Sequence, residues 1–295
     1  MVDPLPLVFG APGTYAQRPG IVASAGAHLA QLGDRILGIV DPVVWKDVEP
    51  ALAGACQTGG IAWRAERFSG ECTEERVSAF GDTARTWRPA AIVAAGGGKV
   101  LDSRKLGAEA LGLPSGMIPT IAATDAPTSR IAVVYNDAHV VTRVAHLRAK
   151  SALVLVDTAI IVNAPIRFLV AGMGAALSTW PEARACALGA ARTPLGGGPS
   201  QTALTLAELC YRSVLSRGRQ ARGRDGRLHH RGRRAHRGGR HSIERFGIRE
   251  RGLAVAHALH AGQRAAPACA PFLHGEKVAF GVPVQAHLMA RGRAA

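Results

Sequence analysis

Two short polar turns, each directly after an apolar run, hold the side chains of this sequence that are best suited to chemistry. The first, Gly96-Gly-Gly-Lys99, follows the run Ala90–Ala95 and opens a stretch with helical spacing. Glycines let a backbone approach a phosphate closely, and the free N–H groups of a first helical turn bind phosphate oxygens. The second turn, Thr124–Ser129, places hydroxyl groups around the carboxylate of Asp125. Such turns, at the carboxyl ends of neighbouring strands, are where an open α/β sheet binds its ligand.

A second group of candidates consists of histidines in the last third of the chain. His257 and His260 are three residues apart on an expected helix, so they share a face. His274 follows at an expected helix start. Imidazoles gathered in this way are suitable ligands for Zn²⁺ or Fe²⁺. Helix histidines are more often structural, so their spacing alone leaves both interpretations open.

Each of these candidates also has a purely structural alternative. The glycine turn lacks the spacing of G-x-G-x-x-G and of a Walker loop, and is equally typical of a plain strand–helix connection. Asp41, at the end of the run RILGIVD, could accept hydrogen bonds from a ribose or simply cap a helix before Pro42. Asp125 could form an Asx turn before Pro127. Asp102 and Lys105 could be a surface ion pair, three residues apart on one helix.

The elements that must position these residues alternate in the first half of the chain. Apolar runs predict strands, and between them the apolar spacing predicts helices. This alternation indicates a parallel sheet covered on both faces, and the strand signal stops at Asn163-Ala-Pro165. We therefore expect an α/β class with an N-terminal Rossmann-like domain over 1–163 and an all-helical domain over 164–295, with the active site between them. The predicted strands are 35–41, 61–68, 90–95, 116–120, 131–136 and 152–156, and the predicted helices are 21–32, 43–55, 73–87, 100–111, 171–188, 201–216, 253–260 and 276–289.

Taken together, GGGKVLDSRK (96–105) and PTIAATDAPTS (119–129) closely resemble the iron-containing, or polyol, alcohol dehydrogenase superfamily and, within it, the glycerol dehydrogenases. The resemblance covers residues 1–216 nearly continuously and resumes at about 252–281. It implies a dehydroquinate-synthase-like fold, NAD and a divalent metal (Zn²⁺ or Fe²⁺) as cofactors, a homo-oligomer, and oxidation of glycerol to dihydroxyacetone. The further matching stretches are FSGEC (68–72), VDTAIIVNAPIRFLVAGMG (156–174), LSTWPEARAC (177–186), LAELCYR (206–212), GLAVAHALHAG (252–262) and HGEKVAFG (274–281).

The same resemblance implies a role for each candidate. Asp125 would contact the polyol, and His257 and His274 would hold the metal and so take part in catalysis, with His260 a neighbour of the site. The residues that would bind NAD are Asp41, Gly97, Gly98, Lys99, Thr120, Ser129, Ile131 and Tyr135. One position departs from the family pattern, because GMGAAL has Ala175 where relatives carry the aspartate that is the third metal ligand. A methyl group cannot coordinate a metal, so we expect weak zinc binding and impaired activity.

The charge of the chain is concentrated in one segment. The net charge is +15 over 295 residues, and 13 arginines with only three acidic residues lie between Arg217 and Arg251. This segment has no apolar periodicity, and we interpret it as a stretch read out of frame, in a chain that also stops short of its relatives. We expect it to be poorly ordered. Two alternatives to a working dehydrogenase therefore remain: a catalytically inactive remnant that binds NAD only, and an arginine-rich nucleic-acid binder.

The remaining composition indicates a cytoplasmic protein without a membrane span. The start has no basic region followed by an unbroken apolar run, and no uncharged apolar stretch approaches about 18 residues. The five cysteines are scattered and never in C-x-x-C spacing, which predicts reduced thiols. We expect a small polyol as the ligand, no membrane partner, and no nucleic acid.

Overall fold

The computed structural model describes residues 5–68, 70–138, 140–222, 253–264 and 266–291. The chain divides into two compact units. One unit holds the parallel sheet and comprises Pro12–Ile121 and Ala126–Ala164. The other is mainly helical and comprises Met1–Ala11, Ala122–Asp125 and Pro165–Ala295.

A six-stranded parallel sheet forms the centre of the first unit, as the alternation of strands and helices predicts. All six residues of its central strand β5 are buried, as are all residues of β3 except Arg35. Such continuous apolar runs are typical of strands that are covered on both faces. In spatial order the strands are β2 (Thr14–Gln17), β9 (Leu153–Val156), β6 (Ser115–Pro119), β5 (Ala91–Gly96), β3 (Arg35–Val40) and β4 (Ala62–Arg67).

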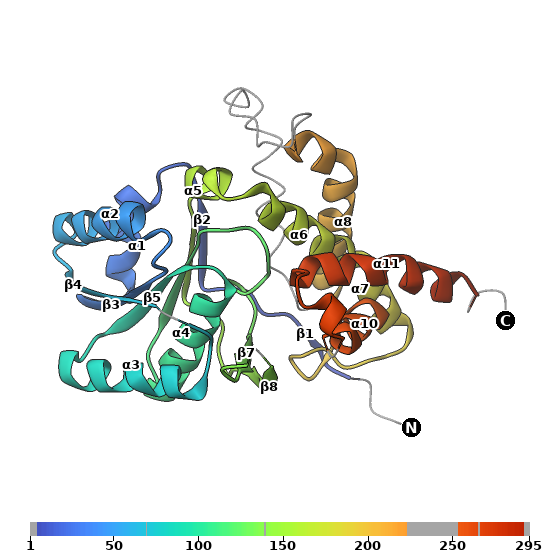
Figure 1. Ribbon diagram of the computed structural model, residues 1–295, viewed down its shortest axis with the longest axis horizontal. Coiled ribbons are helices and arrows are strands. Elements are labelled where there is room, and N and C mark those ends of the chain that lie inside the picture. The colour runs from blue at the N-terminus through green and yellow to red at the C-terminus, as the bar shows by residue number, and fades with distance from the viewer. Residues whose placement is uncertain (1–4, 69, 139, 223–252, 265, 292–295) are drawn as a thin grey trace. The chain divides into compact units, whose positions relative to one another are not determined.

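Helices cover both faces of this sheet, with α1 and α2 on one side and α3 and α4 on the other (Figure 1). The start of α3 is specified locally, because the Thr73 side chain accepts a hydrogen bond from the Arg76 N–H and two glutamates occupy the first turn. The predicted helix over 21–32 is instead a broken series of short turns. The helical elements of this unit are η1 (Val22–Ser24), α1 (Gly26–Leu29), η2 (Ala30–Leu32), α2 (Trp45–Thr58), α3 (Glu74–Trp87), α4 (Gly98–Leu111) and α5 (Thr158–Asn163).

One predicted strand does not join the parallel sheet. β7 (Ile131–Tyr135) pairs antiparallel with β8 (Val141–His146) in a separate two-stranded sheet. The prediction that it lies in the parallel sheet is therefore wrong. The physical reason is the length of the connection, because the short segment 136–140 suffices for a hairpin but not for the crossover that a parallel pair needs.

The second unit is built mainly from helices. The prediction of one helix over 171–188 is wrong, since the chain forms two helices that meet at Ser178. The expectation of no strand after Pro165 also fails, at the two-residue strand β10, which pairs with β1. The elements of this unit are β1 (Leu7–Val8), α6 (Ile166–Leu177), α7 (Thr179–Leu188), β10 (Gly198–Pro199), α8 (Gln201–Arg222), α10 (Val255–Gln263), η4 (Pro267–Cys269) and α11 (His274–Arg291).

The arginine-rich segment is described only at its beginning. Residues 217–222 continue α8 as a helix, so the expectation of poor order is wrong there. The rest of the segment, 223–251, lies outside the described residues, and the out-of-frame interpretation of it stays a prediction.

All five cysteines lie in the described part of the chain, and none of them forms a disulfide. Burial raises the pKa of the Cys56 and Cys72 thiols to about 11, which keeps both protonated and unreactive at neutral pH. Among the described helices, none is long and apolar enough to cross a membrane.

Candidate functional site

Three of the candidate segments meet at the carboxyl ends of adjacent strands in the parallel sheet. Asp41 follows β3 and donates its N–H to the carbonyl of Ala95 on β5, at 2.8 Å. Thr120 follows β6 and donates its N–H to the carbonyl of Gly96, at 3.1 Å. The aspartate, the glycine turn and the threonine are therefore joined through backbone hydrogen bonds, at the edge of the sheet where α/β proteins bind their ligands.

The glycine turn is shaped for close backbone approach. A Cβ at Gly96 would lie 2.7 Å from the Val100 side chain and 3.0 Å from the Cβ of Asp41, so a larger residue would not fit there. Helix α4 begins at Gly98, and its N-cap Gly97 has no side chain that could cap the first turn. The N–H groups of this turn are therefore suited to donate hydrogen bonds to an anionic oxygen ligand.

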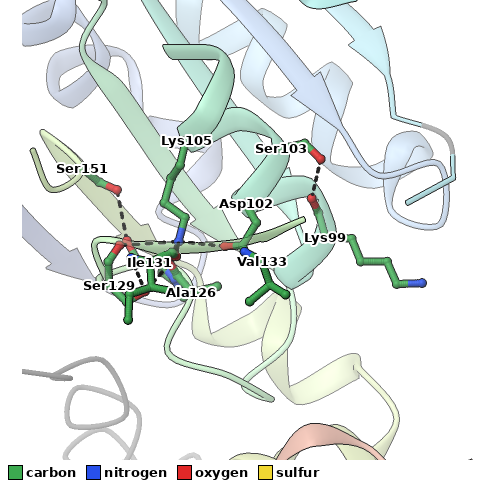
Figure 2. Close-up of polar contacts among 10 residues, drawn as sticks. Lys99, Asp102, Ser103, Lys105, Ala126, Ser129, Ile131, Val133 and Ser151 are labelled. Atoms are coloured by element: carbon green, nitrogen blue, oxygen red, sulfur yellow. Dashed lines mark hydrogen bonds and ion pairs between the residues drawn. The ribbon is translucent and has the colours of Figure 1, made fainter. Parts of the chain in front are cut away.

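Lys99 contacts a carboxylate that the sequence did not indicate as its partner. Its Nζ forms an ion pair with Glu71, which is only 7% exposed and belongs to the FSGEC stretch. Figure 2 shows the Lys99 side chain extending away from the other polar residues of α4. A phosphate would therefore have to share this ammonium with Glu71 or take it over.

Asp41 forms part of the local turn that its structural alternative requires. Its Oδ1 accepts a hydrogen bond from the Val43 N–H at 2.9 Å, two residues along the chain. This is an Asx-type turn before α2. To bind a ribose, the same carboxylate would have to accept hydrogen bonds from the sugar hydroxyls while it holds this turn.

The loop after β6 and the start of β7 hold the remaining nucleotide candidates. The Ser129 hydroxyl accepts from the Ile131 N–H and donates to the Ile131 carbonyl, both at 3.2 Å. Tyr135 donates its N–H to the Cys72 carbonyl at 2.8 Å. The surface alternative for Asp102 and Lys105 is wrong, because Lys105 is 3% exposed and its ammonium lies under this loop (Figure 2).

Three histidines gather in the helical unit. The ring centroids of His257 on α10 and His274 on α11 are 5.4 Å apart. His260 does not point away, since its Nε2 lies 3.2 Å from Nδ1 of His274. All three imidazoles therefore lie together, and the i, i+3 spacing accounts for His257 and His260.

Glu182 on α7 is a functional candidate that sequence reasoning missed. Its side chain is fully buried, and Oε2 lies 2.6 Å from Nδ1 of His257. Oε1 accepts the N–H groups of Ala254 and His257, at 2.9 and 3.0 Å. The carboxylate thus fixes both the first turn of α10 and the orientation of the His257 ring.

The pKa of Glu182 reflects the same contacts. Burial raises it, but the hydrogen bond and charge of His257 and the two backbone N–H groups outweigh burial, so the pKa of Glu182 lies below its ordinary value. A single glutamate in a helical sequence carries no signal of this role. Only the place of Glu182 within LSTWPEARAC, one of the stretches that resemble the family, could have drawn attention to it.

We expect Glu182→Ala to lower the free energy of unfolding by about 3–5 kcal/mol, because it leaves two buried N–H groups and the His257 ring without their acceptor. Glu182→Gln keeps an acceptor oxygen and should lose less. Since the pKa of Glu182 is lowered on folding, its contribution is present above the ordinary pKa and disappears as the pH falls. The gap between the native chain and Glu182→Gln in urea unfolding should therefore shrink in acid. A gap that widens in acid would contradict this assignment.

The position of Ala175 is fixed by a close crossing of two helices. A Cβ at Gly275 of α11 would lie 1.7 Å from the Ala171 carbonyl of α6, and one at Gly174 would lie 2.5 Å from the Gly275 carbonyl. Ala175 and His274 each adjoin this contact in sequence. Ala175 therefore lies beside this helix crossing, and its side chain has no donor atom for a metal.

The described residues do not fit a metal held by three protein ligands. Within that part of the chain, no group of three or more His, Cys, Asp or Glu side chains is arranged to hold a metal ion. Catalytic zinc sites use three protein ligands and an open position. His257 and His274 lie close together, and Ala175 has no carboxylate to join them.

The candidates separate between the two units according to their expected roles. The nucleotide candidates Asp41, Gly97–Lys99, Thr120, Ser129, Ile131 and Tyr135 all lie in the sheet unit. Asp125 lies in the short segment Ala122–Asp125, which belongs to the helical unit together with His257 and His274. The same segment packs closely on α6, since a Cβ at Gly172 would lie 1.9 Å from the Ala122 carbonyl.

The chain is similar to known proteins over most of its length. The family model described as iron-containing alcohol dehydrogenase matches residues 12–158. The chain is 36% identical over 292 residues to a glycerol dehydrogenase of Escherichia coli O6:H1, covering 94% of this chain and 76% of that one. It is 38% identical over 288 residues to a glycerol dehydrogenase of Pseudomonas putida, covering 93% and 75%.

Among solved structures, a probable glycerol dehydrogenase of Sinorhizobium meliloti superposes with a TM-score of 0.83 at 32% identity, covering 94% of this chain and 76% of that one. The sheet with its glycine turn, the paired histidines and these similarities lead to one assignment. The chain belongs to the iron-containing alcohol dehydrogenase family of oxidoreductases.

Proposed function

We propose that this chain is built for NAD-linked oxidation of a small vicinal diol, with glycerol as the substrate and dihydroxyacetone as the product, and that its activity is impaired. The observation that carries the proposal is the joining of Asp41, the glycine turn and Thr120 at neighbouring strand ends. The similarity to glycerol dehydrogenases supports the choice of substrate. We further propose a cytoplasmic homo-oligomer that has no membrane or nucleic-acid partner.

The sheet unit supplies the residues for the dinucleotide. The first turn of α4, which no side chain caps, fits a pyrophosphate. Asp41 would accept the adenosine ribose hydroxyls, and Thr120, Ser129, Ile131 and Tyr135 would line the nicotinamide side. When bound, the nicotinamide accepts the hydride that leaves the alcohol carbon. The contribution of these residues is orientation and the exclusion of water.

The helical unit supplies the residues for the diol. Asp125 would accept a hydrogen bond from a substrate hydroxyl, and His257 and His274 would present imidazole nitrogens to the adjacent oxygens. The set lacks, at Ala175, the aspartate that the family resemblance implies. Turnover would be impaired, because the described residues form no three-ligand site for a cation that would stabilise an alkoxide.

The incomplete ligand set also favours a second function, a catalytically inactive protein that binds NAD only. Measuring NADH formation from glycerol, in the presence and absence of added Zn²⁺, distinguishes the impaired dehydrogenase from the inactive NAD binder. Slow turnover that zinc increases supports the impaired dehydrogenase, whereas NAD binding without any turnover supports the inactive binder. A chain that oxidises glycerol at full rate without metal would overturn both. The nucleic-acid alternative depends on residues outside the described part of the chain.

We expect NAD to bind more tightly than NADP, because the Asp41 carboxylate repels a 2′-phosphate. Lys99→Ala should weaken NAD binding by roughly 1–3 kcal/mol, the range for a hydrogen bond to a charged group. Glu71→Gln is the matched test, since it releases the Lys99 ammonium and should tighten binding. Calorimetric titration of both nucleotides measures these effects. Equal affinities for NAD and NADP would contradict the role of Asp41. An NAD affinity that neither substitution changes would contradict the role of Lys99.

A further inference from the structure

The ammonium of Lys105 is buried beneath the loop formed by residues 126–131. The residue is 3% exposed and lies on α4, about two helical turns after the helix begins at Gly98. Its Nζ donates to the carbonyl of Ala126 at 3.0 Å and to that of Ile131 at 2.5 Å, with the Ser129 carbonyl at 3.5 Å. Figure 2 shows these oxygens arranged around the single nitrogen.

Carbonyl groups that converge on one point repel each other, because their negative ends face one another. A cation at that point attracts each of these oxygens and so offsets their mutual repulsion. An ammonium also supplies three N–H donors to the oxygens. The conformation of the loop over 126–131 therefore depends on the charge and donors of Lys105. Without them, buried carbonyls would be left unsatisfied, and the loop would have to move to reach water.

Asp102 provides the compensating charge and a second connection to the same region. Its Oδ1 forms an ion pair with Lys105 Nζ at 2.7 Å, and its Oδ2 accepts the N–H of Val133 on β7 at 3.0 Å. The pair thus ties α4 both to the loop and to the strand that follows it. Ser151 adds a separate anchor, with its hydroxyl 3.2 Å from the Pro127 carbonyl.

From these contacts we propose that Lys105, assisted by Asp102, is a positioning residue that sets the conformation of the loop over 126–131. The inference rests on the proposed function in one respect, namely that this loop carries the nicotinamide-side residues Ser129 and Ile131. Lys105 itself does not contact the dinucleotide, because its ammonium is buried and its donors are directed at protein oxygens. Lys105 affects the conformation of the loop on the nicotinamide side. It does not affect the glycine turn at the start of α4, which would bind the pyrophosphate.

The first test follows amide hydrogen exchange in the ligand-free protein. Lys105→Met is nearly equal in length but has neither charge nor donors. We expect exchange in peptides containing residues 126–131 to accelerate about tenfold or more, with little change in peptides containing residues 92–97. Lys46→Met, at an exposed lysine of α2, is the control and should change neither region. Unchanged exchange of the loop, or equal acceleration of both regions, would overturn the proposal.

The second test compares two ligands that differ only in the part this loop would face. Lys105→Met should weaken binding of NADH about tenfold or more, while ADP-ribose, which lacks the nicotinamide, should bind within about twofold of the native chain. Equal weakening of both ligands would show general damage, and no weakening would show that the loop does not face the nicotinamide; either result contradicts the proposal. A native chain that binds neither ligand refutes the proposed function, and the exchange experiment still decides the role of Lys105.

Two milder variants keep the proposal testable if Lys105→Met does not fold. Asp102→Asn retains the shape of the partner and removes its charge, and Lys105→Gln retains one donor group. Both should accelerate hydrogen exchange in the loop and weaken the binding of NADH relative to that of ADP-ribose. These are the effects expected of Lys105→Met, by smaller factors. A variant that changes stability without changing this selectivity would contradict the positioning role.

Discussion

Replacing Arg104 with methionine is expected to raise the free energy of unfolding by about 2–4 kcal/mol. Arg104 on α4 is fully buried, and none of its three guanidinium nitrogens has a hydrogen-bond partner among the described residues. Its guanidinium carbon lies 5.1 Å from the centre of the Phe80 ring, and this contact offsets only part of the cost of burying the charge. Methionine keeps the packing of the alkyl chain and removes the charge.

The pH dependence of this gain follows from the lowered pKa. Burial lowers the pKa of Arg104 to about 9, and the charge of Glu66 opposes that shift only in part. Between this value and the higher pKa of an ordinary arginine, the unfolded chain binds more protons than the folded one, so stability rises with pH there. Below about pH 9 both states are protonated and the full penalty is present. The gain from Arg104→Met should therefore be constant between about pH 6 and 8.

Denaturant unfolding of three variants tests this expectation. Arg104→Lys keeps the charge and should give no stabilisation. Arg85→Met removes an exposed arginine of α3 that pairs with Asp82, and should change the free energy of unfolding by no more than about 0.5 kcal/mol. Destabilisation by Arg104→Met would mean that the contact with Phe80 outweighs the buried charge.

The sequence predicted the parallel sheet because its signal is local. The runs at β3, β5 and β6 are apolar throughout and are followed by polar turns, so both their burial and their order could be inferred. β2 and β8 were missed because their residues are mostly half-buried or exposed and show no continuous apolar run. The break between α6 and α7 had a local signal in Pro181, which lacks the N–H that a continuous helix would direct at the Leu177 carbonyl.

The candidate site was only partly predictable, because burial and partner choice depend on tertiary contacts. Asp102 and Lys105 have the spacing of an ordinary surface pair, and nothing in that spacing shows that a loop covers them. The ion pair between Lys99 and Glu71 joins residues 28 positions apart, and the bond between Glu182 and His257 joins residues 75 positions apart. Such partners become visible only when the elements that carry them are packed together.

Ala175→Asp is expected to increase zinc affinity by more than the roughly 10–100-fold that an outer-shell partner typically contributes. The substitution supplies a carboxylate that would bind the metal directly together with two imidazoles, as in the three-ligand set of catalytic zinc sites. Ala175 is half-buried, so the carboxylate keeps part of its hydration and folding should tolerate it. His257 already has its Nδ1 held by Glu182, which fixes the orientation of its imidazole ring.

Zinc binding should be measured by competition with a chelator, together with NADH formation from glycerol. Ala175→Asn is the matched control, because it has the same shape without the negative charge, and it should recover little of the affinity. In the Ala175→Asp background, a second change of His274→Ala should abolish the gain if both side chains hold one ion. Turnover should rise with zinc occupancy. Zinc binding by the unmodified chain as tight as by Ala175→Asp would show that another side chain already completes the site, and His260, at 3.2 Å from His274, would then be the first to replace.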